Sequence, residues 1–107
     1  MIIDEKSTLD ILKHYQNLGF DLNKSMVIDF FIEGSKKNLQ SIESQIVSYR
    51  QDFKTSIERN ENRETWTCYC TINIIPTLEE ILEIEKKTSD IAQKNQCTYE
   101  GFGSYGN

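Results

Sequence analysis

Three cysteine thiols and one imidazole are the side chains of this chain best suited to bind a metal. They belong to Cys68, Cys70, Cys97 and His14. Structural zinc sites usually hold two cysteines with about two to four residues between them in a turn, and no such pair occurs here, because a single residue separates Cys68 from Cys70. Cys68 and Cys70 instead fall in a strand-like segment, where residues two apart point to the same face. We therefore expect no metal, and we interpret the cysteines as small buried apolar residues.

The motifs of common hydrolases and transferases are missing from the chain. It contains no G-x-S-x-G, no phosphate-binding P-loop and no H-E-x-x-H. His14 is not accompanied by an identifiable acid or nucleophile that would make it a general base. The odd number of cysteines also argues against a disulfide framework. We therefore expect a protein that is not an enzyme and uses no cofactor.

A run of carboxylates opens the last helix-like segment, at Glu79, Glu80, Glu83 and Glu85. Acidic side chains near a helix N-terminus stabilise the helix through its dipole, so the run of acids can be explained without a binding partner. The alternative is an acidic patch that binds a basic protein. The formal net charge of −5 favours a basic protein partner because complementary potentials steer association.

Two aromatic residues raise the question of RNA binding. Phe31 and Tyr69 lie on the second faces of predicted central strands, where aromatic rings can stack on bases. The usual basic and glycine-aromatic pattern of such domains is absent, however, and the negative net charge opposes phosphate binding. We interpret both residues as packing under the first helix, and we do not expect a nucleic-acid partner.

Apolar spacing, capping residues and turns divide the chain into seven elements. Helices are predicted over residues 7–18, 36–49 and 78–95, and strands over 26–33, 53–58, 65–75 and 97–105. Ser7 is expected to cap the first helix and Thr77 the last. Gly101 and Gly103 predict bends or close backbone contacts in the final strand.

The order of these elements predicts one domain over residues 1–107. After a leading helix within 1–19, the β-α-β-β-α-β order of 26–105 is that of an α+β, ferredoxin-like sandwich with a four-stranded antiparallel sheet. The second and third helices should cover one face of the sheet, and the leading helix the other face or an edge. No apolar run is long enough to span a membrane. The N-terminal residues do not resemble a secretory signal, so we expect a cytoplasmic protein.

Three short motifs occur in order along the chain. They are residues 19–24 (GFDLNK) followed by 27–31 (VIDFF), residues 74–81 (IIPTLEEI), and residues 99–103 (YEGFG). Together they resemble the RraB family of bacterial regulators, which inhibit ribonuclease E. The family motifs have a histidine where Asp29 stands and a tryptophan where Phe102 stands.

The resemblance implies a non-catalytic regulator that binds a protein partner, with a ribonuclease as the candidate. An immunity protein that neutralises a toxin is a second hypothesis, and an RNA-binding domain is a third. We expect the partner surface to include the ends of the first and last strands and the acids of the last helix. These candidate residues are Asp29, Tyr99, Glu100, Phe102, Glu79, Glu80 and Glu83.

Overall fold

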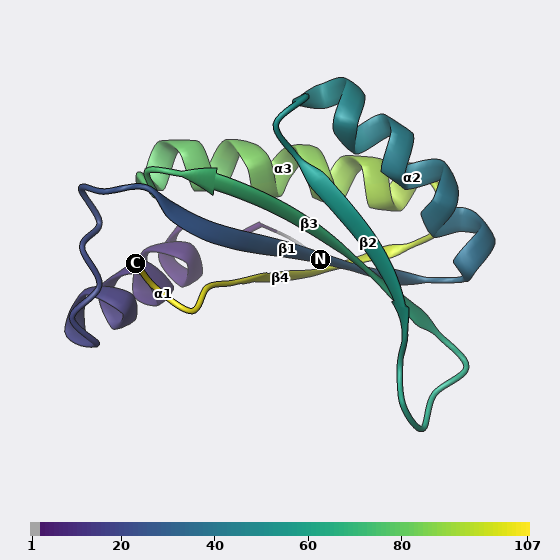
Figure 1. Ribbon diagram of the computed structural model, residues 1–107, viewed down its shortest axis with the longest axis horizontal. Helices are drawn as coiled ribbons and strands as arrows, with labels where there is room; N and C mark the ends of the chain where they lie inside the picture. Colours follow the sequence, from purple (N-terminus) through teal and green to yellow (C-terminus); the bar gives the residue numbers. More distant parts are fainter. Residues whose placement is uncertain (1–2) are drawn as a thin grey trace.

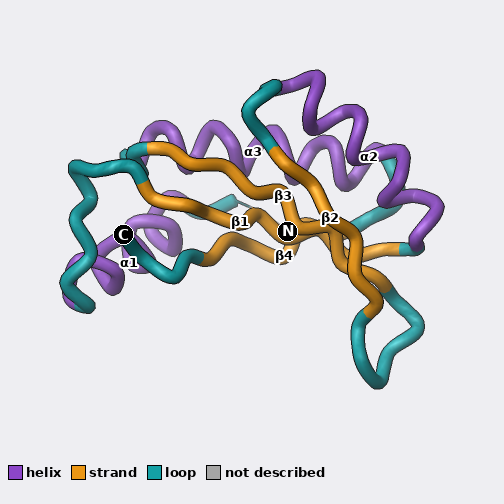
Figure 2. Tube along the Cα trace, in the orientation of Figure 1, coloured by secondary structure: helices purple, strands orange, loops and turns teal. Residues whose placement is uncertain are grey.

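The computed structural model describes residues 3–107, so the first two residues of the predicted leading segment 1–19 lie outside it. The elements are α1 (Glu5–Asn17), β1 (Met26–Gly34), α2 (Lys36–Tyr49), β2 (Lys54–Arg59), β3 (Trp66–Ile74), α3 (Leu78–Lys94) and β4 (Thr98–Gly103). The strands form one antiparallel sheet in the order β2-β3-β1-β4 (Figures 1 and 2). The predicted ferredoxin-like α+β fold is therefore confirmed.

Alternating side chains build the core between the sheet and two helices. On β1, Ile28, Phe30 and Ile32 are fully buried and face the helices, whereas the residues between them are at least partly exposed. Helices α2 and α3 lie on this side of the sheet (Figure 1), and their buried apolar side chains pack into the core. Burial of these stripes supplies the main favourable free energy of folding. The prediction that the second and third helices share one face is correct.

Of the two places predicted for the leading helix, the other face of the sheet or an edge, α1 takes the one at the β4 edge. Among the helices and strands, α1 packs against α3 and lies beside it in the same layer. Its Tyr15 ring makes an edge contact with Phe102, which in turn contacts Phe30 on the helix-covered face of the sheet. The interpretation that Phe31 and Tyr69 pack under the first helix is therefore wrong. The helix broadens the covered layer past β4 and leaves the second face of the sheet uncovered.

Helix α1 also begins earlier in the sequence than predicted. Asp4, rather than Ser7, is the N-cap, and its carboxylate accepts a hydrogen bond from the backbone N–H of Lys6. Ser7 lies inside the first turn and donates its hydroxyl to the same carboxylate at 3.1 Å. The other predicted cap is confirmed, since Thr77 accepts from the N–H of Glu80. Within residues 3–107, no helix combines the length and apolar character that a membrane span requires.

Candidate partner-binding face of the sheet

The face of the sheet turned away from the helices, here called the open face, carries an aromatic pair at its centre. Phe31 on β1 lies directly opposite Tyr69 on β3. Their ring centroids are 5.5 Å apart and the ring planes meet at 89°, an edge-to-face contact. Such aromatic pairs contribute favourable electrostatics beyond the area that they bury. The pair is half-buried and borders solvent.

A groove of about 520 Å³ runs past this pair, and we call it the aromatic groove. Strands β1, β3 and β4 and the segment after β4 contribute to it. Its lining residues are Asp29, Phe31, Thr67, Tyr69, Glu100, Gly103, Ser104 and Tyr105. Tyr105 is fully exposed at the rim. A concave surface lined by aromatic rings with a few polar groups is the usual form of a binding site.

A β-bulge in the last strand decides which of its residues reach the groove. Ile32 pairs with Tyr99, but Phe31 pairs with Gly101, so Glu100 is an extra residue in β4. Gly101 adopts a φ of 120°, a conformation that favours glycine. The bulge turns Tyr99 and Phe102 toward the helices although they are three residues apart, and it leaves Glu100 exposed on the open face.

Gly103 shapes the neighbouring wall of the groove. A Cβ atom at this position would lie 3.4 Å from two carbons of the Phe31 ring. The ring therefore lies against β4 at this position. The predicted bend is confirmed at Gly101, whereas at Gly103 a Cβ atom would make only an ordinary van der Waals contact, so the structure shows no close approach there that requires glycine.

Carboxylates give the open face its charge. Asp29 accepts a hydrogen bond from the Thr71 hydroxyl across the strand pair. Glu33, farther along β1, forms an ion pair with Arg63 at 3.1 Å. Within residues 3–107, neither Asp29 nor Glu100 forms an ion pair. The aromatic groove therefore contains two carboxylates that have no ion-pair partner within 4.0 Å among residues 3–107.

The residues predicted to bind a partner do not form one surface. Asp29 and Glu100 line the aromatic groove. Tyr99 and Phe102 are 1% and 9% exposed, because the bulge directs both side chains into the core.

The acids of α3 belong to the helix layer, on the opposite side of the sheet from the groove. Glu79 and Glu83 are exposed there. Glu80 is held by the guanidinium of Arg50, which also lies 3.6 Å from Asp52. The hydrogen bond that Arg50 donates to Glu80 raises the pKa of Arg50 above its usual value. Because Glu80 is paired within the chain, Glu79 and Glu83 are the freer carboxylates of this run.

Sequence reasoning did not identify a buried polar cluster around Glu85. This residue of α3 is 5% exposed, and its carboxylate accepts hydrogen bonds from the Thr8 hydroxyl at 2.5 Å and the Tyr99 hydroxyl at 2.7 Å. Burial and the nearby Glu85 raise the pKa of Tyr99 well above its usual range. The helical spacing could have indicated that Glu85 is buried, because it lies four residues after the apolar Ile81 and therefore on the same face of the helix.

The three cysteines lie in or near the core and away from the groove. Cys68 and Cys70 are buried with their sulfur atoms 3.8 Å apart, and Cys97 is half-buried. The neighbouring Cys68 and burial raise the pKa of the Cys70 thiol, so this thiol stays protonated and unreactive. In the part of the chain that the structure describes, no cluster of three or more histidine, cysteine or acidic side chains could hold a metal ion.

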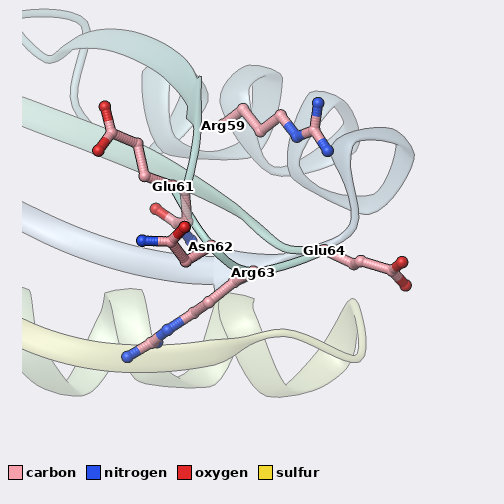
Figure 3. A pocket seen from close by; sticks show the side chains of 6 residues that line it. Arg59, Glu61, Asn62, Arg63 and Glu64 are labelled. Carbon is pink, nitrogen blue, oxygen red and sulfur yellow. The ribbon is translucent and has the colours of Figure 1, made fainter.

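A second hollow, of about 600 Å³, lies at the loop between β2 and β3. It is formed by the last residue of β2 and the five loop residues that follow: Arg59, Asn60, Glu61, Asn62, Arg63 and Glu64. Figure 3 shows the two arginines and two glutamates pointing away from one another. Side chains that diverge in this way do not create a common binding centre, so the aromatic groove is the stronger candidate site.

The comparisons with known proteins agree with this architecture. The family described as Regulator of ribonuclease activity B, RraB, matches residues 5–104. That range contains all seven helices and strands, from α1 to β4. A comparison with curated proteins found no match. Because the family match extends over nearly the whole chain, this protein belongs to the RraB family of regulators of ribonuclease activity.

Proposed function

We propose that this protein is a non-catalytic regulator that binds a ribonuclease through the open face of its sheet and lowers the activity of that enzyme. The observation that carries the proposal is the aromatic groove on the face that no helix covers, with Phe31 and Tyr69 at its centre. Half-exposed aromatic residues in a groove are typical anchors of protein interfaces. Membership of a family of ribonuclease regulators supports the identity of the partner.

The hydroxyl groups around the groove favour binding over chemistry. The Thr71 hydroxyl donates to Asp29, and the Ser104 hydroxyl donates to the backbone carbonyl of Val27 at 2.7 Å. Each therefore has a structural role that fixes a strand or the segment after β4. A nucleophilic hydroxyl would need a base that is itself oriented by a third group, and among the described residues no side chain other than Thr71 hydrogen-bonds or ion-pairs with Asp29.

RNA binding is the second candidate, because Phe31 and Tyr69 occupy the two central strands, where ferredoxin-like domains stack bases. The unpaired carboxylates of Asp29 and Glu100 oppose it, since they would face the phosphates of a bound strand. A basic protein surface can pack its cationic side chains against the aromatic rings and form ion pairs with these carboxylates. The charge of the groove therefore favours a protein partner over RNA.

The test measures binding and inhibition together. Purified protein is titrated into ribonuclease E, the enzyme that the sequence resemblance implies, and both the affinity and the cleavage of a fluorogenic RNA are recorded. Replacement of Phe31 by serine should weaken binding about thirtyfold, as expected for an interface anchor worth about 2 kcal/mol. Glu83→Ala, on the helix layer, is the matched control and should leave affinity unchanged.

Three results would contradict the proposal. The wild-type protein could fail to bind the enzyme, or bind it without slowing cleavage. The Phe31→Ser and Glu83→Ala variants could also bind equally well, which would place the interface elsewhere. A single-stranded RNA bound at low salt by the wild type and lost in Phe31→Ser would support the RNA-binding alternative instead.

A further inference from the structure

We infer that the aromatic groove binds an arginine side chain, presented by an extended basic segment of a protein partner. The inference rests on the proposed function for the open face as the docking surface. It adds the chemistry of the occupant, and it follows from the charges, the rings and the glycines of the groove.

The charges of the groove call for a cation. Glu33 already has Arg63 as its counter-ion at the end of the open face. Asp29 and Glu100 line the groove itself, and neither forms an ion pair within residues 3–107. Thr71 occupies one oxygen of Asp29, so the other oxygen is available to a ligand. A cationic side chain that enters the groove would balance the charge of both carboxylates.

The aromatic rings select the type of cation. Phe31 and Tyr69 meet edge to face, and ring faces attract cations through their quadrupole. A guanidinium group is planar, stacks on rings and donates paired hydrogen bonds to a carboxylate, whereas a lysine ammonium is a compact and strongly hydrated charge. A groove that combines rings with carboxylates therefore favours arginine over lysine.

The glycines of β4 explain why the segment should be extended. Gly101 and Gly103 present no side chain beside Phe31, and a Cβ added at Gly101 would meet no atom within 4 Å. The backbone of a ligand can therefore approach this side of the sheet closely. An extended segment can lie with its backbone against β4 while its arginine side chain reaches the rings of Phe31 and Tyr69.

Three acetylated and amidated pentapeptides test the inference, with the sequences Gly-Arg-Gly-Arg-Gly, Gly-Lys-Gly-Lys-Gly and the citrulline analogue of the first. Titrations of the ¹⁵N-labelled full chain should show chemical-shift changes at Phe31, Tyr69 and Glu100. The arginine peptide should bind more tightly than the lysine peptide, and the citrulline peptide should bind weakest. Asp29→Asn and Glu100→Gln should each lower the affinity for the arginine peptide about two- to fivefold. Glu79→Gln is the control and should leave this affinity unchanged.

Equal binding of arginine and citrulline peptides, or shift changes confined to α2 and α3, would overturn the inference. Its failure is separable from failure of the proposed function. If ribonuclease E binds the wild type and not Phe31→Ser, but the groove shows no preference for arginine, the proposed function stands and the arginine site falls. If the groove prefers arginine but ribonuclease E does not bind, the arginine site stands and the proposed function falls.

Discussion

Removal of one hydroxyl group, in Tyr99→Phe, tests whether the buried cluster around Glu85 holds α1, α3 and β4 together. The Tyr99 hydroxyl donates to Glu85 at 2.7 Å in a site where both residues are nearly inaccessible. Hydrogen bonds to charged groups contribute about 1.5–3 kcal/mol. Thr8 still donates to the other carboxylate oxygen in this variant. We therefore expect the free energy of unfolding to fall by about 1.5 kcal/mol, the lower end of that range.

Urea unfolding at neutral pH measures this loss through the midpoint, and the slope of the transition should not change. Tyr69→Phe is the matched control, because it removes the same atom from a half-buried ring whose hydroxyl makes no hydrogen bond within residues 3–107. The control should stay within about 0.5 kcal/mol of the wild type. A second variant, Thr8→Val, removes the other donor. The two losses should not add in the double variant, because both donors share one carboxylate. A Tyr99→Phe protein as stable as Tyr69→Phe would refute the role of the cluster.

Three further predictions concern the backbone, the first helix and pH. Gly101→Ala should cost about 1–3 kcal/mol by urea unfolding, because alanine is strained at a φ of 120°, whereas Gly103→Ala, which meets only an ordinary contact distance, should cost less. Asp4→Ala should lower the melting temperature more than Ser7→Ala, because Asp4 is the N-cap of α1. Loss of an N-cap side chain typically lowers the free energy of unfolding by about 0.5–2 kcal/mol. Stability should fall as pH rises above about 10, because Tyr99 keeps its proton in the folded chain and loses it in the unfolded chain. Urea midpoints at pH 9 and 11 should therefore differ more for the wild type than for Tyr99→Phe.

The sheet and two of its helices could be predicted because local signals agree there. Strand β1 alternates buried and exposed residues with a period of two, and α3 begins at a threonine cap followed by an inward apolar stripe. These patterns depend on residues close together in the sequence, so no tertiary information is needed to find them. The Ser35 cap of α2 is a further local signal of this kind.

The place of α1 could not be predicted, because its contacts are distant in sequence. Its buried face, with Leu12 and Tyr15, indicates that the helix packs on something but does not say on what. Thr8 bonds to Glu85, which is 77 residues away, and Tyr15 meets Phe102. These long-range contacts place α1 beside α3. The consequence for function is large, since they leave the open face free.

The two departures from the family motifs fall on opposite faces of the sheet, and this separates their effects. Phe102 replaces the tryptophan and packs between Tyr15 and Phe30, at centroid distances of 6.3 and 5.9 Å. One aromatic residue for another keeps that contact, so the fold tolerates the change. Asp29 replaces the histidine and lies in the aromatic groove, where it adds a negative charge that an imidazole would lack. Asp29→His should therefore weaken binding of the arginine pentapeptide, and loss of the hydrogen bond from Thr71 should lower the unfolding free energy by only about 0.5–1.5 kcal/mol. A large loss of stability in Asp29→His would show instead that its bond from Thr71 is needed to hold β1 and β3 together.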